Sequence, residues 1–478
     1  MKRLVKIEIL IYVILFGVCV FILLQSPLAP FAKNIIGIDS GIYIYSARQI
    51  LDGQLIYKEV IDNKGPFLYF IIAAALFIFN KNFIGIWIFE LFSLFVASVI
   101  MYKTARFFAD KISSLLAVIA GMLFLVITIG RGNLAEEWAL PYISIALYIF
   151  VDYLKGNKPL TIVRLFILSL TFVLTFMLRA NLVALWGGFG TVLLIKWITE
   201  KKYKELIRNV LFILLFVLLC LLPFFLYFYC KGILSDAIYW AYTFNMFEYA
   251  PGANRLMSIR ATLLNISYIG IIIPVFIAIY MFFHNKTAAH GGVLLALIFT
   301  ALACSLGHGF WHYYAVFTPL LVIPYSYIFA IIRENISKRK YIFLFILFLV
   351  FNSLFIGRQL WLVYHNYVGK SAYALSMEKL TEIITQNTKP SDKILVKGYR
   401  SEIYLYSGRT AATRFPYLQH QSYLVKENYV KDAEKALPKL IIQDDLKFAD
   451  VFNLDSLLIH KYQLIKTIDK IEIWKLKE

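Results

Sequence analysis

The chain has 478 residues, of which 60% are hydrophobic and 16% are charged, and its mean hydropathy is +0.72. Soluble globular domains carry about 25% charged residues, so this composition excludes a soluble enzyme, a disordered chain and a fibrous protein and indicates a membrane protein. The net charge is +19, but positive charge collects in the cytoplasmic loops of membrane proteins, so we expect no nucleic-acid partner.

The N-terminus begins MKRLVK and continues as an apolar run from Ile7 to about Leu24. A cleaved signal peptide has a shorter apolar core and a small-residue cleavage site, which the segment 25–30 fits poorly. We therefore expect a retained first transmembrane helix with its N-terminus in the cytoplasm.

Eleven apolar runs are expected to cross the membrane, because a spanning helix needs about 20 mostly apolar residues. In chain order they are 7–26, 84–103, 112–130, 138–154, 162–178, 181–198, 207–229, 262–283, 291–306, 313–331 and 341–356. The run 66–79 has only 14 residues, and we expect it to lie on the outer surface. This assignment places 19 Lys and Arg residues before residue 357 in the cytoplasm and 10 outside, as the positive-inside rule favours.

An odd number of spans, with the N-terminus in the cytoplasm, places the tail, residues 357–478, on the extracytoplasmic side of the membrane. Strand-like runs at 393–397, 439–443, 464–468 and 471–476 occur there with helix-like runs at 372–386 and 423–436. Strands alternating with helices predict a small α/β unit. The expected fold class is therefore a polytopic α-helical membrane protein of about 11 transmembrane helices. Its membrane domain is residues 1–356 and its extracytoplasmic α/β domain is residues 357–478.

Ionisable residues gather on the predicted outer loops, which hold eight of the 15 acidic residues before residue 357. The first outer loop, residues 27–83, contains Asp39, Asp52, Glu59 and Asp62 together with Arg48, Lys58 and Lys64. The second, residues 130–138, is very short but contains Arg131, Glu136 and Glu137. Ionisable groups at membrane depth are costly and are functional candidates for that reason.

Several of these residues also have a structural interpretation. Asp39 could be the N-cap of an amphipathic helix over residues 40–51. Lys64 could be an interfacial lysine whose ammonium group reaches water. Glu90, inside a predicted span, is either a buried and hydrogen-bonded structural acid, which we favour, or an acid near the site. His312 lies at another outer boundary, where interfacial polar residues are expected rather than zinc ligands.

Three motifs of the first loop together resemble the first-loop signature of bacterial GT-C glycosyltransferases. They are DSGIYIY at residues 39–45, LDGQLIY at 51–57 and DNKGPFLY at 62–69. More closely, residues 1 to about 140 resemble the family that includes protein O-mannosyltransferases and the lipid A aminoarabinose transferase, glycosyltransferase family 39-like proteins. The boundary around His312, Tyr313 and Pro319 is also similar to this family.

The resemblance implies a many-spanning protein with an outward-facing site and a polyprenyl-phosphate-linked sugar as donor. It makes Asp39 the acidic residue of the first loop that takes part in catalysis. Glu136 or Glu137 stands at the position of a second acidic residue. It makes Lys64 the lysine that meets the lipid phosphate. Weaker candidates for substrate binding are Tyr43, Tyr57, Asp62, Arg255, His312 and Tyr313.

The sequence departs from the family pattern at three points. Ile42 stands where some members have an arginine, the usual Lys-Pro-Pro is Lys64-Gly65-Pro66, and the second acidic residue is Glu rather than Asp. These departures concern the sugar and the acceptor more than the class of reaction.

The residue types suit sugar transfer. A carboxylate within hydrogen-bonding reach takes the proton from an acceptor hydroxyl, and we assign this role to Asp39. The leaving lipid phosphate is already a stable anion, so cations rather than a general acid should stabilise it. Lys64 and Arg131 are the expected cations, with Arg179 and Arg255 as weaker candidates. Inversion at the anomeric carbon is implied by the family.

No cofactor is expected. The four cysteines lie in or beside apolar runs, at Cys19, Cys220, Cys230 and Cys304, which excludes a disulfide framework and a CxxC metal site. Two carboxylates could hold a divalent cation, but we expect none.

The predicted function is an inverting glycosyltransferase of the cell envelope, in a bacterial plasma membrane. Its expected partners are a polyprenyl-phosphate-sugar donor, a glycan, lipid or protein acceptor, and membrane lipids. The alternatives are a lipid-linked sugar flippase or transporter and a polysaccharide polymerase or ligase. A transporter should show inverted repeats and ionisable residues near the bilayer midplane, where the sequence offers only Glu90. A non-enzymatic scaffold would not need Asp39, Lys64 and Glu136 together.

Overall fold

The computed structural model of the chain describes residues 2–249, 255–268, 270–306, 309–418, 423–444 and 454–477. The chain divides into two compact units. The first comprises Met1–Gln25, Trp87–Cys230 and Ala250–Val363, and the second comprises Ser26–Ile86, Lys231–Tyr249 and Tyr364–Glu478. The second unit thus combines the whole of the first outer loop with most of the C-terminal tail.

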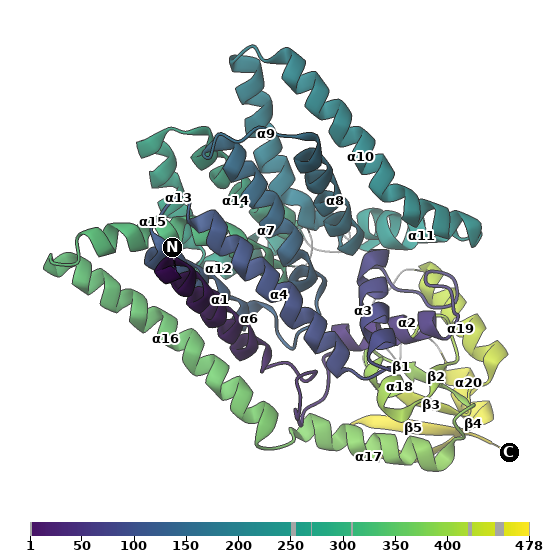
Figure 1. Cartoon of the computed structure of the whole chain (residues 1–478). Helices are drawn as coiled ribbons and strands as arrows, with labels where there is room; N and C mark the ends of the chain where they lie inside the picture. Colours follow the sequence, from purple (N-terminus) through teal and green to yellow (C-terminus); the bar gives the residue numbers. More distant parts are fainter. Residues whose placement is uncertain are drawn as a thin grey trace. The chain divides into compact units, whose positions relative to one another are not determined.

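The first unit consists of helices (Figure 1). They are α1 (Lys2–Leu23), α4 (Ile84–Ala105), α5 (Lys111–Leu123), α6 (Leu125–Thr128), α7 (Ala135–Leu154), α8 (Ile162–Leu178), η1 (Ala180–Val183), α9 (Ala184–Thr199), α10 (Tyr203–Cys230), α12 (Arg255–Tyr268), α13 (Ile272–Asn285), α14 (Ala288–Ser305), η4 (Trp311–Phe317), α15 (Thr318–Glu334) and α16 (Arg339–Tyr367). Helix α9 packs against α14, α5 against α15, and α7 against α8.

Many of these helices are suited to a membrane. Within the described ranges, eight helices are long and apolar enough to cross one. Helix α10 is the clearest case, because its 28 residues are strongly apolar and most of its large side chains are exposed. The run 66–79 forms α3 (Pro66–Ile78), which at 13 residues is short for a span. The count of eleven spans stays a prediction.

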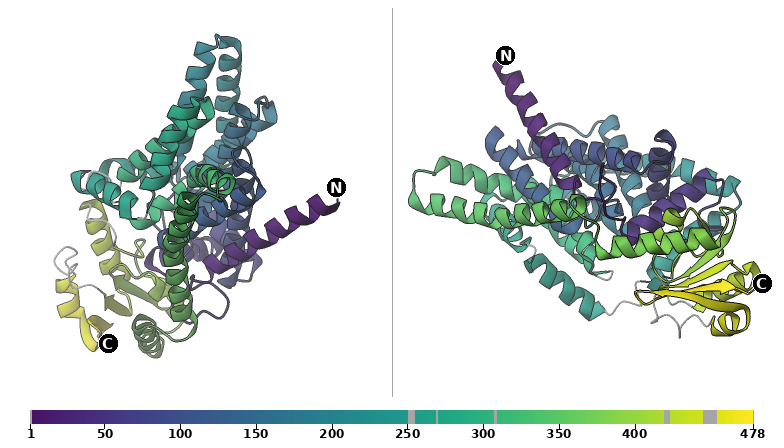
Figure 2. Two further views of the ribbon diagram at one scale, coloured as in Figure 1. Left: turned by 90° about the vertical axis from the view of Figure 1, so that its left-hand side faces the viewer. Right: turned by 90° about the horizontal axis from the view of Figure 1, so that it is seen from below.

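Three predicted spans differ from the helices that form. The run 262–283 contains two helices, α12 and α13, with Gly270 between them at φ +80°, a left-handed conformation that glycine adopts without strain. The run 112–130 is divided between α5 and α6. Helix α16 continues to Tyr367, well past the predicted end at residue 356, as the long green helix in Figure 2 shows.

The second unit contains a five-stranded sheet in the order β2-β1-β3-β5-β4. Its strands are β1 (Lys393–Lys397), β2 (Thr410–Ala411), β3 (Leu440–Gln443), β4 (Tyr462–Ile468) and β5 (Ile471–Leu476). Strand β1 pairs in parallel with β2 and β3, and β5 pairs antiparallel with β3 and β4. Strand β3 is buried throughout, which explains its apolar run at residues 440–442.

The α/β character of the tail is confirmed. The four predicted strand-like runs form β1, β3, β4 and β5, and the two helix-like runs form α17 (Ala372–Asn387) and α19 (Tyr423–Ala436). The sequence did not predict β2, α18 (Glu402–Ser407) or α20 (Asp455–Lys461). The second unit also contains three short helices from the middle of the sequence. They are α11 (Leu234–Ile238), η2 (Tyr239–Thr243) and η3 (Asn245–Tyr249).

Helix α2 (Ile38–Leu51) of the first loop packs against α3 and against α18 of the tail (Figure 1). Residues Ser40–Ala47 of α2 are all buried, so the helix lacks the exposed polar face that the amphipathic prediction gave it. Gly41 allows the close approach to α18, because a Cβ atom there would lie 3.1 Å from Glu402 Cβ and backbone N. The tail therefore holds α2 in place.

Glu402 should make the stability of the second unit depend on pH. Burial raises the pKa of Glu402 from 4.5 to about 7, although Tyr373 donates a hydrogen bond to its carboxylate. A raised pKa favours the protonated folded state, so stability should fall as the pH rises from about 4.5 to 7. Glu402→Gln should remove this pH dependence. At pH 8 it should raise the free energy of unfolding by up to roughly 3 kcal/mol, and the melting temperature with it.

The measurement is thermal unfolding of the purified full-length protein at pH values from 5 to 8. Glu378→Gln is the matched control, because Glu378 is an exposed acid on α17. A wild-type melting profile in Glu402→Gln at every pH would contradict the expectation.

Candidate active site

Asp39 lies in the first turn of α2 and is half-buried. Gly37 is the N-cap of this helix and no side chain caps it, so the interpretation of Asp39 as the N-cap is wrong. Among the described residues, none forms a hydrogen bond or an ion pair with the Asp39 carboxylate. A negative charge in this position is favourable, because the helix dipole is positive at its N-terminus. The carboxylate is thus available to accept a proton from a ligand.

Lys64 is held just before α3 by other residues of the first loop. Its Nζ donates to Asn63 Oδ1 at 2.9 Å and lies 6.0 Å from the centre of the Tyr43 ring. Its carbonyl oxygen accepts a 2.6 Å hydrogen bond from the Tyr57 hydroxyl. Asn63 in turn exchanges two hydrogen bonds with Asn245, at 2.9 and 2.6 Å. An ammonium group has three N–H donors, so Lys64 can also bind an anion.

Asp62 anchors this loop and is buried. It is 2% exposed, and it accepts hydrogen bonds from the Asn63 backbone N–H, from the Tyr69 hydroxyl at 2.6 Å and from the Tyr417 hydroxyl. The Tyr69 hydroxyl also accepts a bond from the Lys64 backbone N–H, at 3.2 Å. Burial and the negative charge of Asp62 raise the pKa of Tyr417 well above 10, which keeps its phenol protonated as a donor. Asp62 therefore positions Lys64 and joins the loop to the tail.

The second unit contains five predicted site residues, which we call the first-loop cluster: Asp39, Tyr43, Tyr57, Asp62 and Lys64. The charge of Asp39 acts on Tyr417, which donates a hydrogen bond to Asp62. Tyr57 has φ +72°, a left-handed conformation that is unusual for an aromatic residue and is often found at functional sites. Asn63 and Tyr69 belong to a first-loop motif, but the sequence analysis assigned them no role. Nothing in the sequence pattern pointed to Asn245 or Tyr417.

In the first unit, Glu136 and Arg179 form an ion pair. Glu136 lies in the first turn of α7, and its Oε1 is 2.5 Å from Nη1 of Arg179 at the end of α8. The Arg179 guanidinium also lies over the Tyr313 ring, 4.0 Å from its centre. The side chains of Glu136 and Arg179 are only 3% and 16% exposed. Three predicted site residues are therefore in mutual contact, and Arg179 already has a carboxylate partner.

Glu137 lies beside Glu136 and is 4% exposed. It interacts electrostatically with Glu90 of α4, whose carboxylate accepts a hydrogen bond from the Asn133 backbone N–H. Asn133 Oδ1 also accepts a 3.0 Å bond from Trp138 Nε1. This arrangement needs a left-handed turn, which Asn133 provides at φ +60°. Glu90 is thus a buried, hydrogen-bonded acid, as the sequence suggested.

The remaining predicted site residues, Arg131, Arg255 and His312, belong to the first unit. Arg131 is exposed on the loop before α7. His312 is half-buried and packs edge-on against Tyr313, with 4.7 Å between ring centres. Arg255 is exposed at the start of α12, and its side chain forms no hydrogen bond or ion pair with the residues that the structure describes.

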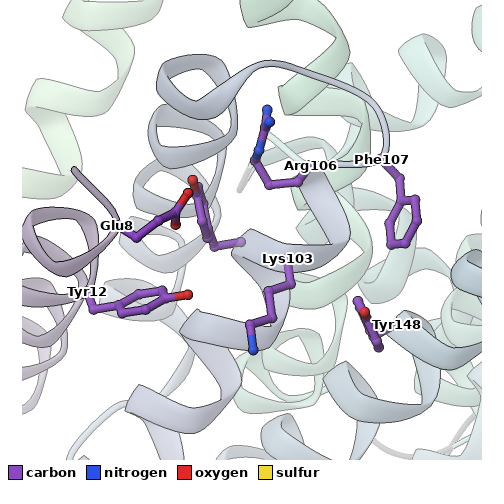
Figure 3. Close-up of a pocket in the computed structure, with 7 residues that line it drawn as sticks. Glu8, Tyr12, Lys103, Arg106, Phe107 and Tyr148 are labelled. Atoms are coloured by element: carbon purple, nitrogen blue, oxygen red, sulfur yellow. The ribbon is translucent and has the colours of Figure 1, made fainter. Parts of the chain in front are cut away.

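A cavity of about 260 Å³ in the first unit is lined by other residues (Figure 3). Glu8 and Tyr12 of α1 lie on one side of it, and Lys103 and Arg106 lie at the end of α4. Figure 3 shows the Lys103 and Arg106 side chains extending in opposite directions. The two cations do not converge as a single phosphate group would need, and none of the predicted site residues lines this cavity.

Loss of the Arg179 side chain should destabilise the first unit. Arg179→Met leaves the Glu136 carboxylate buried without its counter-ion, which typically costs about 3–5 kcal/mol. The melting temperature of the purified protein measures this effect, and Glu136→Gln in the same chain should restore much of the loss. Wild-type melting of Arg179→Met alone would contradict this account of the pair.

No protein-family model matches the chain, and no curated protein matches it in sequence. Solved structures match it in fold. ArnT from Cupriavidus metallidurans bound to undecaprenyl phosphate aligns over 97% of this chain and 97% of its own, with a TM-score of 0.65 and 11% identity. The same protein in the apo state aligns over 97% of both chains, with a TM-score of 0.51 and 13% identity.

The oligosaccharyltransferase of Archaeoglobus fulgidus in its apo form aligns over 91% of this chain and 69% of its own. The TM-score is 0.53 and the identity 12%. Both proteins are GT-C superfamily members, so the predicted GT-C type fold is confirmed. The chain is a multi-pass membrane protein with this fold and a small C-terminal sheet.

Proposed function

We propose that this chain, which has the fold of ArnT, is an inverting glycosyltransferase. It moves a sugar from a polyprenyl-phosphate-linked donor to an acceptor hydroxyl, on the outer face of a bacterial plasma membrane. The observation that carries the proposal is the fold match, over 97% of both chains, to ArnT bound to undecaprenyl phosphate. The presence of Asp39 and Lys64 in one compact unit supports it.

In the proposed reaction Asp39 is the general base. Its carboxylate, which forms no hydrogen bond or ion pair with the described residues, removes the proton from the acceptor hydroxyl. The acceptor oxygen then bonds to the anomeric carbon as the bond from that carbon to the phosphate oxygen breaks. The electron pair of the broken bond stays on the lipid phosphate, and attack from the opposite face inverts the anomeric configuration.

Lys64 is proposed to stabilise the departing phosphate. Its ammonium group is positioned by Asn63 and retains N–H donors for the phosphate oxygens. The N-terminus of α3, which begins at Pro66, adds a favourable partial positive charge. A fixed cation at the point where charge develops lowers the barrier without reorganisation during the reaction.

The other predicted residues keep their proposed roles. Glu136 and Glu137 are proposed as the second acidic group of the family pattern, and Arg131 and Arg179 as further phosphate-binding cations. In this proposal Glu136 holds Arg179 over Tyr313 in the resting protein. The N-terminus is proposed to face the cytoplasm and the C-terminal domain the outside, as the positive-inside rule favours.

We also propose that the transfer needs no metal ion. Treatment of the purified protein with EDTA is then expected to leave the transfer rate unchanged, because the cationic side chains stabilise the phosphate. A loss of activity that Mg²⁺ or Mn²⁺ restores would contradict this part of the proposal.

A surface-glycan profile tests the proposed function. We would compare by mass spectrometry the native strain, a deletion strain, and the deletion carrying the wild-type gene. One sugar should disappear in the deletion and return with the wild-type gene, while its polyprenyl-linked precursor accumulates. A flippase would produce the same loss of sugar, but purified protein would then fail to consume the lipid-linked donor.

A further inference from the structure

A second cavity, of about 530 Å³, lies wholly within the second unit. This volume is in the usual range of about 300–1,000 Å³ for ligand sites. It is formed by the C-terminal half of α2, the turn after it, the start of β1, the segment around β2 and helix α19. None of the first-loop cluster residues lines it.

The wall of this cavity is held by fixed contacts. Arg414 forms two hydrogen bonds with Asp432, at 2.9 and 3.2 Å, and its carbonyl oxygen accepts a 2.8 Å bond from the Ile61 N–H. On another side, the Tyr45 hydroxyl of α2 accepts a 2.8 Å bond from the Ala411 N–H of β2. These contacts join the first loop to the tail, so the shape of the cavity wall is fixed by hydrogen bonds of the fold.

Four long polar side chains of the lining end in groups without a hydrogen bond to the described residues: Gln49, Gln54, Lys393 and Lys435. Within the described residues, none of these four side chains forms a hydrogen bond or an ion pair. Each glutamine amide can both donate and accept, which suits recognition of neighbouring hydroxyl groups. The two ammonium groups only donate. The cavity is lined by three cations, Lys393, Arg414 and Lys435, and by two acids, Glu59 and Asp432, so its lining has a net charge of +1. Arg414 is paired with Asp432, and Glu59 accepts a 2.7 Å hydrogen bond from the Leu55 N–H.

The lining therefore selects a ligand by its chemistry. Ligand sites are usually lined mainly by apolar side chains, whereas this lining is mostly polar and does not suit a polyprenyl chain. The amides match a polyhydroxylated molecule and the two lysines match a negative charge on it. Tyr45 and Gln49 stand six and ten residues after Asp39 on the same helix, or about 9 and 15 Å along its axis.

We propose that this cavity binds the acceptor of the reaction, an anionic glycan, through a part of it that does not react. This inference rests on the proposed function, since it assigns the cavity to the same transfer. The shared chemistry is a sugar that carries a carboxylate or a phosphate group. Binding of a non-reacting part of the acceptor would improve transfer to long acceptors over short ones.

The test is calorimetric titration of the full-length protein in nanodiscs with three probes. Digalacturonate carries carboxylates, glucose 6-phosphate carries a phosphate, and maltose is the neutral sugar. At least one anionic probe should bind about tenfold more tightly than maltose, and Lys393→Met with Lys435→Met should remove that advantage. The matched control, Lys379→Met with Lys466→Met, removes two exposed lysines of the tail outside the cavity and should bind like wild type.

Two outcomes overturn the inference: neither anionic probe binds, or both bind the Lys393 and Lys435 double variant as tightly as wild type. The anionic probe that binds identifies the recognised group as a carboxylate or a phosphate. Transfer activity is measured on the same preparations, so the two proposals fail separately. If an anionic probe binds but the lipid-linked donor is not consumed, the proposed function is contradicted. If the donor is consumed but no anionic probe binds, the proposed acceptor site is contradicted.

Discussion

Asp39→Asn should abolish most sugar transfer while the protein remains folded. The substitution keeps the size of the side chain but removes the carboxylate that accepts the proton of the acceptor hydroxyl. Removal of a general base typically lowers the rate about 10²–10⁴-fold. Asp39 has no described hydrogen-bond partner to lose, so the melting temperature should stay close to that of wild type. The measurement is the transfer rate of purified protein, together with the glycan profile of the complemented deletion strain.

The matched control is Asp52→Asn at the other end of the same helix. Asp52 is the C-cap residue of α2 and forms an exposed ion pair with Lys81 at 2.7 Å. Exposed pairs contribute little to stability, so this variant should transfer sugar at the wild-type rate. Full transfer by Asp39→Asn would remove Asp39 as the base and leave it as an ordinary first-turn acid.

Lys64→Met should lower the rate of transfer by about 10²–10³-fold, as expected when one preorganised donor to a developing charge is lost. Methionine retains most of the length of the side chain but not its charge. The effect should fall mainly on kcat, because the phosphate gains negative charge as the bond to the sugar breaks. Lys64→Arg keeps the charge and should retain part of the activity.

Lys58→Met is the control for charge, since Lys58 is an exposed lysine of the same loop and lies outside the first-loop cluster. It should leave both kcat and KM unchanged. Equal losses of transfer rate in Lys58→Met and Lys64→Met would mean that the loop acts through its overall positive charge. That result would contradict a specific role of Lys64.

The regular elements of the tail could be predicted closely from the sequence. The apolar run of β3 and the patterns of β1, β4 and β5 are local, and so is the helix start at Ser371, whose hydroxyl accepts a bond from the Ala374 N–H. Strand β2 was missed because its two residues carry no period of their own. It is fixed by parallel pairing of Lys393 with Thr410.

The candidate site was predictable only as far as its motifs are local. Asp39 and Lys64 stand in recognisable segments of the first loop. The partners that position Lys64 do not, because Tyr417 is 355 residues away from Asp62 and Asn245 is 182 residues away from Asn63. Such contacts depend on the tertiary fold. The break between α12 and α13 was missed for a related reason, since apolar composition continues on both sides of Gly270.

The central claim is tested most directly by donor consumption in a purified system. Wild-type protein and Asp39→Asn, each in nanodiscs, are incubated with the lipid extract and the envelope fraction of the deletion strain, and polyprenyl lipids are followed by mass spectrometry. We predict that wild type converts one polyprenyl-phosphate-linked sugar into free polyprenyl phosphate and that Asp39→Asn does not. If folded wild-type protein leaves every lipid-linked sugar unchanged, the chain is not a glycosyltransferase of this kind.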